Sequence, residues 1–150
     1  LAPIFTDMVE KHKMIADFEQ LKYSPEMLRK VWDNQVENFK NLISGGWTNN
    51  YVLEFITYIR TSEYAGRFFP GTSLGTLLIS KPRNARLNYQ QTLAISVDKE
   101  NGRIRLKYSD WDTIDSSEDW EKAILWTVEC DGEELKSKFT EFLEWNKSWH

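Results

Sequence analysis

The chain has 150 residues, of which 41% are hydrophobic and 28% are charged, so it fits one globular domain with a sizeable core. Aromatic residues make up 14% of it and Gly and Pro are few, which excludes an intrinsically disordered or collagen-like chain. The formal net charge of -4 is unevenly distributed: residues 110–150 hold twelve acidic and four basic residues, whereas residues 1–109 hold eleven acidic and fifteen basic ones.

The first part of the sequence predicts three helices. Apolar residues recur at helical spacing over residues 6–20, which indicates a short first helix. Ser24 as N-cap and Pro25 in the first turn begin a second helix, whose apolar stripe continues to Gly45-Gly46. A third helix is expected over about residues 48–66, although its β-branched and aromatic content leaves a strand as the alternative.

The second part of the sequence changes to a period of two, which is typical of strands. Apolar and polar residues alternate over residues 92–97 and again over residues 103–108. Residues 98–102, Asp-Lys-Glu-Asn-Gly, have the composition of a turn between them. The pattern therefore predicts a β-hairpin with one buried face.

Two further apolar stretches and a capped helix complete the predicted fold. Residues 77–79 and 124–128 indicate additional strands, and Asp131 with Glu134 forms the capping box of a final helix. We therefore expect a single α+β domain over residues 1–150. About three N-terminal helices should pack on an antiparallel sheet of three to five strands, followed by a C-terminal helix.

A G-x-S-x-G pattern spans residues 71–75. In hydrolases this pattern places a nucleophilic serine on a sharp strand-to-helix turn, within reach of a histidine. Here Pro70 precedes the pattern, a strand-like stretch follows it, and His150 is the one histidine further along the chain. The context instead indicates a Gly-rich connection from the helices to the sheet.

The histidines and the cysteine also argue against common catalytic and metal sites. With one cysteine, Cys130, and two histidines, His12 and His150, the chain lacks the three or four ligands of a zinc site, and we expect no metal or cofactor. His12 lies on an apolar helical stripe and Cys130 ends a predicted strand, so both are expected to be packing residues. A lone cysteine and the lack of a long apolar stretch favour a cytoplasmic protein that does not bind membranes.

Six acidic residues and two tryptophans are concentrated between the last two predicted strands: Asp110, Trp111, Asp112, Asp115, Glu118, Asp119, Trp120 and Glu121. A calcium loop would need regularly spaced ligands and a glycine, which this segment lacks. A catalytic carboxylate pair would need both acids in one cleft. A solvated loop is a further interpretation. The two tryptophans favour an anionic surface that steers a basic partner and anchors it through aromatic side chains.

Basic residues predominate before this segment, with nine bases and three acids over residues 57–109. Some of them share one face of a predicted strand or lie near Tyr89, and they could form a nucleic-acid or ligand surface: Arg83, Arg86, Arg103, Arg105 and Lys107. A pI near 5.3 and the acidic C-terminal part would repel a phosphate backbone. A charged solvent-exposed strand face is therefore favoured over nucleic-acid binding, and these bases could also pair with the acidic segment.

The sequence ends with Trp126-Thr127-Val128-Glu129-Cys130-Asp131-Gly132, followed by a predicted helix from Glu133 to Trp145. In this ending, in size and in acidity, the chain resembles the small α+β immunity proteins with which bacteria neutralise polymorphic or contact-dependent toxins. The resemblance implies a non-catalytic inhibitor of a basic toxin. Its contact residues would be Asp110, Trp111, Asp112, Asp115, Glu118, Asp119 and Trp120. Acidic type III secretion chaperones have a similar composition and are the alternative, and the oligomeric state is left open.

Overall fold

The computed structural model describes residues 24–149. The first helix expected over residues 6–20 lies outside these residues, as do His12 and His150.

Two α-helices begin the described part of the chain. α2 (Pro25–Ser44) starts after Ser24, whose hydroxyl accepts a hydrogen bond from a backbone N–H at 3.3 Å, as expected for its N-cap. α3 (Asn50–Arg60) starts after Asn49, which caps it in the same way. The prediction of a helix here is confirmed, but α3 ends at Arg60 and a separate 3-10 turn, η1 (Glu63–Gly66), follows it.

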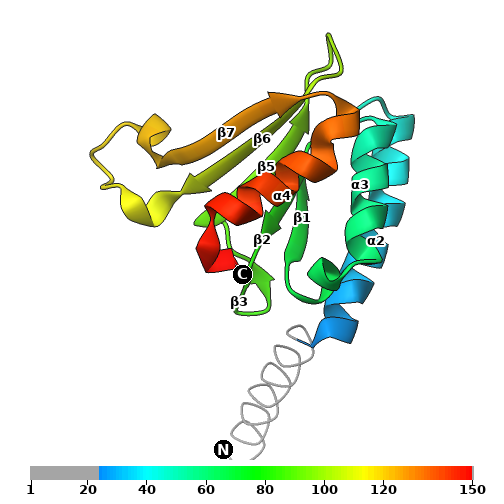
Figure 1. Cartoon of the computed structure of the whole chain (residues 1–150), viewed down its shortest axis with the longest axis horizontal. Coiled ribbons are helices and arrows are strands. Elements are labelled where there is room, and N and C mark those ends of the chain that lie inside the picture. The colour runs from blue at the N-terminus through cyan, green and yellow to red at the C-terminus, as the bar shows by residue number, and fades with distance from the viewer. Residues whose placement is uncertain (1–23, 150) are drawn as a thin grey trace, which may run out of the picture.

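Five strands form one antiparallel sheet in the order β1-β2-β5-β6-β7. They are β1 (Phe69–Ser73), β2 (Thr76–Ser80), β5 (Gln91–Val97), β6 (Ile104–Asp110) and β7 (Ile124–Cys130). A small hairpin of β3 (Pro82–Arg83) and β4 (Arg86–Leu87) forms a separate two-stranded sheet next to β1 and β2 (Figure 1). The predicted hairpin and the two additional strands are confirmed.

The interpretation of residues 71–75 as a connection between helices and sheet is wrong, because these residues form the end of β1 and its turn to β2. Ser73 pairs with Thr76, and Leu74 (φ 48°) and Gly75 (φ 84°) form the turn between them. Pro70 in β1 weakens the local strand signal. The strand forms through tertiary pairing with β2.

The C-terminal helix starts with the predicted capping box. The Glu134 carboxylate accepts a hydrogen bond from the backbone N–H of Asp131 at 3.1 Å, after which come η4 (Gly132–Glu134) and α4 (Leu135–Trp145). A last 3-10 turn, η5 (Lys147–Trp149), folds back towards the sheet and buries Trp149. Figure 1 shows α4 crossing in front of the sheet, with α2 and α3 beside β1.

The three α-helices of residues 24–149 share one core with one face of the sheet. Trp32 of α2, Phe55 of α3 and Phe142 of α4 are buried together with the inward residues of the strands, such as Ile95 and Leu106, which lie opposite each other on β5 and β6. The helices therefore cover one face, as the sequence predicts for an α+β domain. None of the described helices has the length and hydrophobicity needed to cross a membrane.

Candidate protein-binding surface

The chain between β6 and β7 carries the acidic residues and the two tryptophans, and we call residues 110–123 the acidic connection. β6 and β7 pair from Ile104 opposite Cys130 to Ser109 opposite Ile124, with an irregularity near the end of this ladder. The acidic connection then extends outward beyond the strands, as Figure 1 shows in yellow. It contains two 3-10 turns, η2 (Trp111–Thr113) and η3 (Trp120–Ala123).

Three of the six acidic side chains shape the acidic connection itself. Asp110 caps η2 by accepting a hydrogen bond from the backbone N–H of Asp112 at 3.0 Å. Asp119 caps η3 through a backbone N–H two residues later, at 3.2 Å. Glu118 accepts a hydrogen bond from the backbone N–H of Asp115 at 3.1 Å. These carboxylates satisfy backbone donors that the tight turns leave without partners.

The other three carboxylates are free to interact with another molecule. Across residues 24–149, the side chains of Asp112, Asp115 and Glu121 have no hydrogen-bond or ion-pair partner. The one basic residue of the acidic connection, Lys122, lies 3.7 Å from a carboxylate oxygen of Glu118. The acidic connection therefore presents negative charge that is not neutralised within the described chain.

Both tryptophans of the acidic connection are exposed. Trp111 is 40% exposed and Trp120 is 56% exposed, whereas Trp32 and Trp149 are almost completely buried. A tryptophan within a loop often folds back onto the core, and these two do so only in part. The structure thus places two large aromatic surfaces among unpaired carboxylates.

Two exposed apolar residues that sequence reasoning missed lie where the acidic connection joins the fold. Leu125, at the start of β7, is 42% exposed, and Trp145, at the end of α4, is 47% exposed. The Trp145 ring stacks on that of Trp126, with centroids 6.4 Å apart. A signal for Leu125 was present, because it alternates with Trp126 and must face the opposite side of the sheet.

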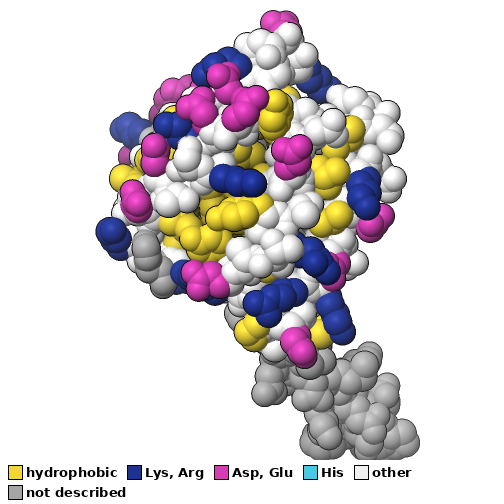
Figure 2. Space-filling view, turned by 45° about the vertical axis from the view of Figure 1, so that its right-hand side comes forward, with side chains coloured by type: hydrophobic (Ala, Val, Ile, Leu, Met, Phe, Trp, Pro, Cys, Tyr) yellow, Lys and Arg dark blue, Asp and Glu magenta, His cyan; other side chains and the backbone are white. Residues whose placement is uncertain are grey.

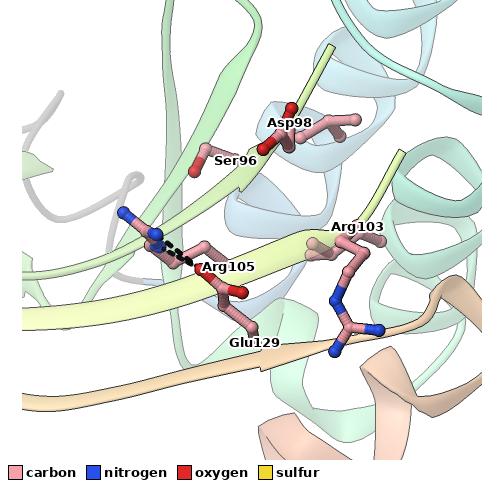
Figure 3. A pocket seen from close by; sticks show the side chains of 7 residues that line it. Ser96, Asp98, Arg103, Arg105 and Glu129 are labelled. Atoms are coloured by element: carbon pink, nitrogen blue, oxygen red, sulfur yellow. Dashed lines mark hydrogen bonds and ion pairs between the residues drawn. The ribbon is translucent and has the colours of Figure 1, made fainter. Parts of the chain in front are cut away.

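Arg105 in β6 and Arg103 just before it pair with acids outside the acidic connection. Arg105 lies directly opposite Glu129 on β7 and donates a hydrogen bond to its carboxylate at 2.5 Å (Figure 3). Arg103 pairs with Asp131 at 2.8 Å. Together with Ser96, Val97, Asp98 and Ile104, the residues Arg103, Arg105 and Glu129 line a hollow of about 170 Å³. Lys107 is half-buried further along β6.

The other two basic candidates, Arg83 and Arg86, lie apart from Arg103 and Arg105. Arg83 and Arg86 lie on the β3–β4 hairpin, where they and the 68% exposed Tyr89 line a depression of about 520 Å³. Tyr89 precedes the first residue of β5, whereas Arg105 lies opposite Ser96, near the last residue of β5. From Gln91, the first residue of β5, to Ser96 the strand spans roughly 17 Å at about 3.3 Å per residue, so the two basic groups lie towards opposite ends of β5. They do not form one continuous surface.

The remaining candidate residues take structural positions. Cys130 is buried at the end of β7, and burial raises the pKa of its thiol, which makes it a poor nucleophile. Ser73 lies in a hairpin and not on a strand-to-helix turn. Within the described residues, no group of His, Cys, Asp and Glu side chains is arranged to hold a metal ion.

The helical side of the molecule carries mixed charge. Figure 2 shows Lys, Arg, Asp and Glu side chains interspersed there, with hydrophobic side chains visible between them. A shallow groove of about 540 Å³ lies on this side, between α3 and α4, and is lined by Leu53, Tyr58 and Lys136 among others. Charge of a single sign is therefore a feature of the acidic connection and not of this side.

Comparisons with protein-family models, with curated proteins and with solved structures gave no significant match.

Proposed function

We propose that this protein is a non-catalytic binding domain that holds a basic protein partner through the acidic connection. The observation that carries the proposal is the exposure of Trp111 and Trp120 beside carboxylates without partners. Arg103 and Arg105 lie at the end of β6 that is far from the acidic connection and are paired with Asp131 and Glu129, so they do not neutralise it. Exposed aromatic residues rimmed by polar groups are typical of interaction sites.

The two kinds of residue have different roles in this proposal. Unpaired carboxylates attract a basic surface over several ångströms and raise the association rate, which salt then screens. The tryptophans supply apolar area: at about 250 Å² each, their exposed fractions of 40% and 56% amount to roughly 240 Å². Burial at about 25 cal/mol per Å² is worth about 6 kcal/mol before the costs of association are subtracted.

The resemblance in size, acidity and C-terminal ending supports an immunity-type function. In this proposal the partner is a bacterial toxin domain whose substrate site is basic. Asp112 and Asp115 occupy that site and the tryptophans anchor the complex. A chaperone of the type III secretion kind is the alternative, because it would use the same acidic surface on a basic client.

A second candidate function rests on the β3–β4 hairpin. Across residues 24–149, Arg83 and Arg86 have no acidic partner, and Tyr89 beside them is 68% exposed. Guanidinium groups next to an exposed aromatic ring suit an anionic ligand or single-stranded nucleic acid. The hairpin is smaller than the acidic connection and carries no large apolar anchor besides Tyr89, so we place it second.

Affinity capture from the native host with quantitative mass spectrometry tests the proposal. The bait variant D112N/D115N/E121Q removes three charges and keeps the three capping carboxylates. A matched control, E54Q/E100Q/E144Q, removes three exposed glutamates elsewhere that have no ion-pair partner in the described structure. The wild-type protein and the control should capture the same basic protein, and the first variant at least about tenfold less of it. Equal capture by both variants would contradict the proposal.

The tryptophans are tested in the same experiment. Replacing Trp111 and Trp120 together by alanine should reduce capture at least as strongly as the charge variant, since aromatic anchors dominate most interfaces. Tyr89→Ala removes an even more exposed aromatic ring from the β3–β4 hairpin and should leave capture unchanged. If Tyr89→Ala abolishes capture and the tryptophan variant does not, the second candidate function is favoured.

A further inference from the structure

Strand β7 is an edge strand: one of its sides pairs with β6, and no described strand pairs with the other side. The strand order ends with β7, so β6 pairs along one of its sides, and Figure 1 shows β7 at the rim of the sheet. In an antiparallel pair, alternate residues direct both their N–H and C=O groups away from the partner strand. Alternate residues over Ile124–Cys130 therefore present backbone donors and acceptors outward.

The opposite edge, β1, is protected. α2 packs alongside it: the Trp32 indole donates to the carbonyl of Phe68 at 2.9 Å, and Asn38 donates to the Thr72 hydroxyl at 3.1 Å. β1 also contains Pro70, which has no N–H to offer to another strand. The contacts with α2 and the proline in β1 thus both prevent another strand from pairing with this edge.

β7 carries few of the features that usually protect an edge. Its seven residues, Ile-Leu-Trp-Thr-Val-Glu-Cys, include no Pro, Gly or Lys, and five of them are β-branched, aromatic or leucine. Its one charged residue, Glu129, is paired with Arg105 of β6, and the irregularity in its pairing with β6 is confined to the end near Ser109. Trp126 and Val128 lie on the core-facing side of β7 but are only half-buried, and β7 has no further described strand beside it. A strand added to β7 would cover them.

Charge indicates what kind of strand fits this edge. Residues 110–134, which comprise β7 and the segments on both sides of it, contain ten acidic residues and one basic residue, Lys122. A second copy of the chain paired through β7 would bring two such segments together, and like charges at an interface are unfavourable. A basic extended segment would instead be attracted, mainly at the end of β7 next to the acidic connection, because Glu129 and Asp131 towards the other end already pair with Arg105 and Arg103.

We infer that the partner adds a basic, extended polypeptide segment to the free edge of β7, as an additional strand of the sheet. This inference rests on the proposed function and specifies the form of the partner. Main-chain hydrogen bonds to β7 provide affinity, and alternate side chains of the added strand provide specificity by contacting Trp126 and Val128 on one face and Leu125 on the other. The acidic connection and β7 then form one continuous site.

The inference is tested with an end-blocked peptide of about eight alternating lysine and valine residues, long enough to cover the seven residues of β7. In the full-length protein, hydrogen exchange of alternate β7 amides should be fast without peptide and at least about tenfold slower with it. An acidic peptide of alternating glutamate and valine should give no protection. Protection by both peptides, or by neither, would overturn the inference.

Backbone methylation of the peptide separates strand addition from simple charge attraction. One peptide is N-methylated at its valines and another at its lysines, so that each lacks the N–H donors of one edge. Strand addition predicts that one of the two binds at least about tenfold more weakly than the parent peptide and the other binds equally well. Equal affinity of the two peptides would overturn strand addition.

Two protein variants complete the test. Leu125→Lys places a positive charge within β7 and should weaken binding of the lysine–valine peptide. Leu74→Lys makes the same change at a 79% exposed position near the opposite edge and should leave binding unchanged. If the D112N/D115N/E121Q variant loses its partner but the peptide does not protect β7, the proposed function stands and this inference fails. If the peptide protects β7 but that variant keeps its partner, strand addition stands and the acidic connection is not the site.

Discussion

Truncation of Trp149 to alanine should destabilise the fold much more than truncation of a tryptophan in the acidic connection. Trp149 is 2% exposed, and its ring centroid lies 5.0 Å from that of Phe142, 5.2 Å from that of Phe68 and 5.8 Å from that of Tyr108. Its removal leaves a cavity among three aromatic rings. For a buried tryptophan this loss is expected to lower the free energy of unfolding by about 3–5 kcal/mol.

Trp120→Ala gives the matched comparison. The side chain is 56% exposed, so of about 250 Å² it buries roughly 110 Å², worth at most about 2.7 kcal/mol at about 25 cal/mol per Å². The unfolded chain already buries part of this area, and an exposed site leaves no closed cavity. We therefore expect the free energy of unfolding to fall by less than about 2 kcal/mol.

Urea denaturation followed by far-ultraviolet circular dichroism measures both variants without using tryptophan as the probe. The slope of the unfolding free energy against urea concentration should be the same in both, so that the midpoints report stability. A loss for Trp120→Ala as large as that for Trp149→Ala would show that Trp120 is packed in a core. The proposal that it anchors a partner would then lose its main support.

Three further measurements test other parts of the structure. Gly75→Ala should lower the unfolding free energy by about 2 kcal/mol or more, because φ of Gly75 is 84° and the new Cβ would lie 2.4 Å from the Trp47 carbonyl oxygen. If urea denaturation shows unchanged stability, this turn geometry is refuted. The Tyr51 hydroxyl donates a hydrogen bond to the Glu133 carboxylate at 2.7 Å and lowers the pKa of that carboxyl. The bond therefore stabilises the fold fully at a pH above the ordinary glutamate pKa, and this stabilisation is lost as the pH falls through the lowered pKa. Tyr51→Phe should raise the pKa of Glu133 in a carboxyl NMR titration, and an unmoved pKa would contradict the contact. Because burial raises the pKa of Cys130, its reaction with a disulfide reagent at mildly alkaline pH should be slow until urea unfolds the chain; fast labelling of the native protein would argue against its burial.

Elements with strong local signals could be predicted from the sequence. α2 is specified by Ser24, Pro25 and the terminal glycine pair, and the start of the C-terminal helix by the Asp131–Glu134 capping box, because capping satisfies backbone groups within a few residues. The β5–β6 hairpin follows from alternation around a turn. In each case the interactions that determine the structure are close together in the sequence.

Strand β1 could not be predicted in this way. Phe69-Pro70-Gly71-Thr72-Ser73 contains two residues that are unfavourable in strands, and only pairing with β2 and contacts with α2 make it one. The β3–β4 hairpin, whose paired segments have two residues each, was missed for a similar reason.

Local sequence also does not determine whether a tryptophan is buried. Trp149 follows Asn146-Lys147-Ser148, a polar stretch, yet it is buried because η5 folds back onto the core. Trp120 follows acidic residues and is exposed.

The position of the candidate site could be predicted, but its internal organisation could not. The acidic run identified the β6–β7 segment, although only the structure divides its carboxylates into those that cap turns, such as Asp110, and those without partners, such as Asp115. The pairing of Arg105 with Glu129 depends on the register of β6 and β7, which alternation alone leaves open. That β7 is an edge follows from strand order, a property of the whole fold.

The kinetics of partner binding test the central claim most directly. The partner captured by the wild-type protein is immobilised, and association and dissociation rates are measured over a range of salt concentrations for the wild-type protein, D112N/D115N/E121Q and E54Q/E100Q/E144Q. An acidic binding surface predicts that the first variant associates at least about tenfold more slowly at low salt and depends less on salt, while the second variant matches the wild-type protein. If the two variants bind alike at every salt concentration, the acidic connection is not the binding surface.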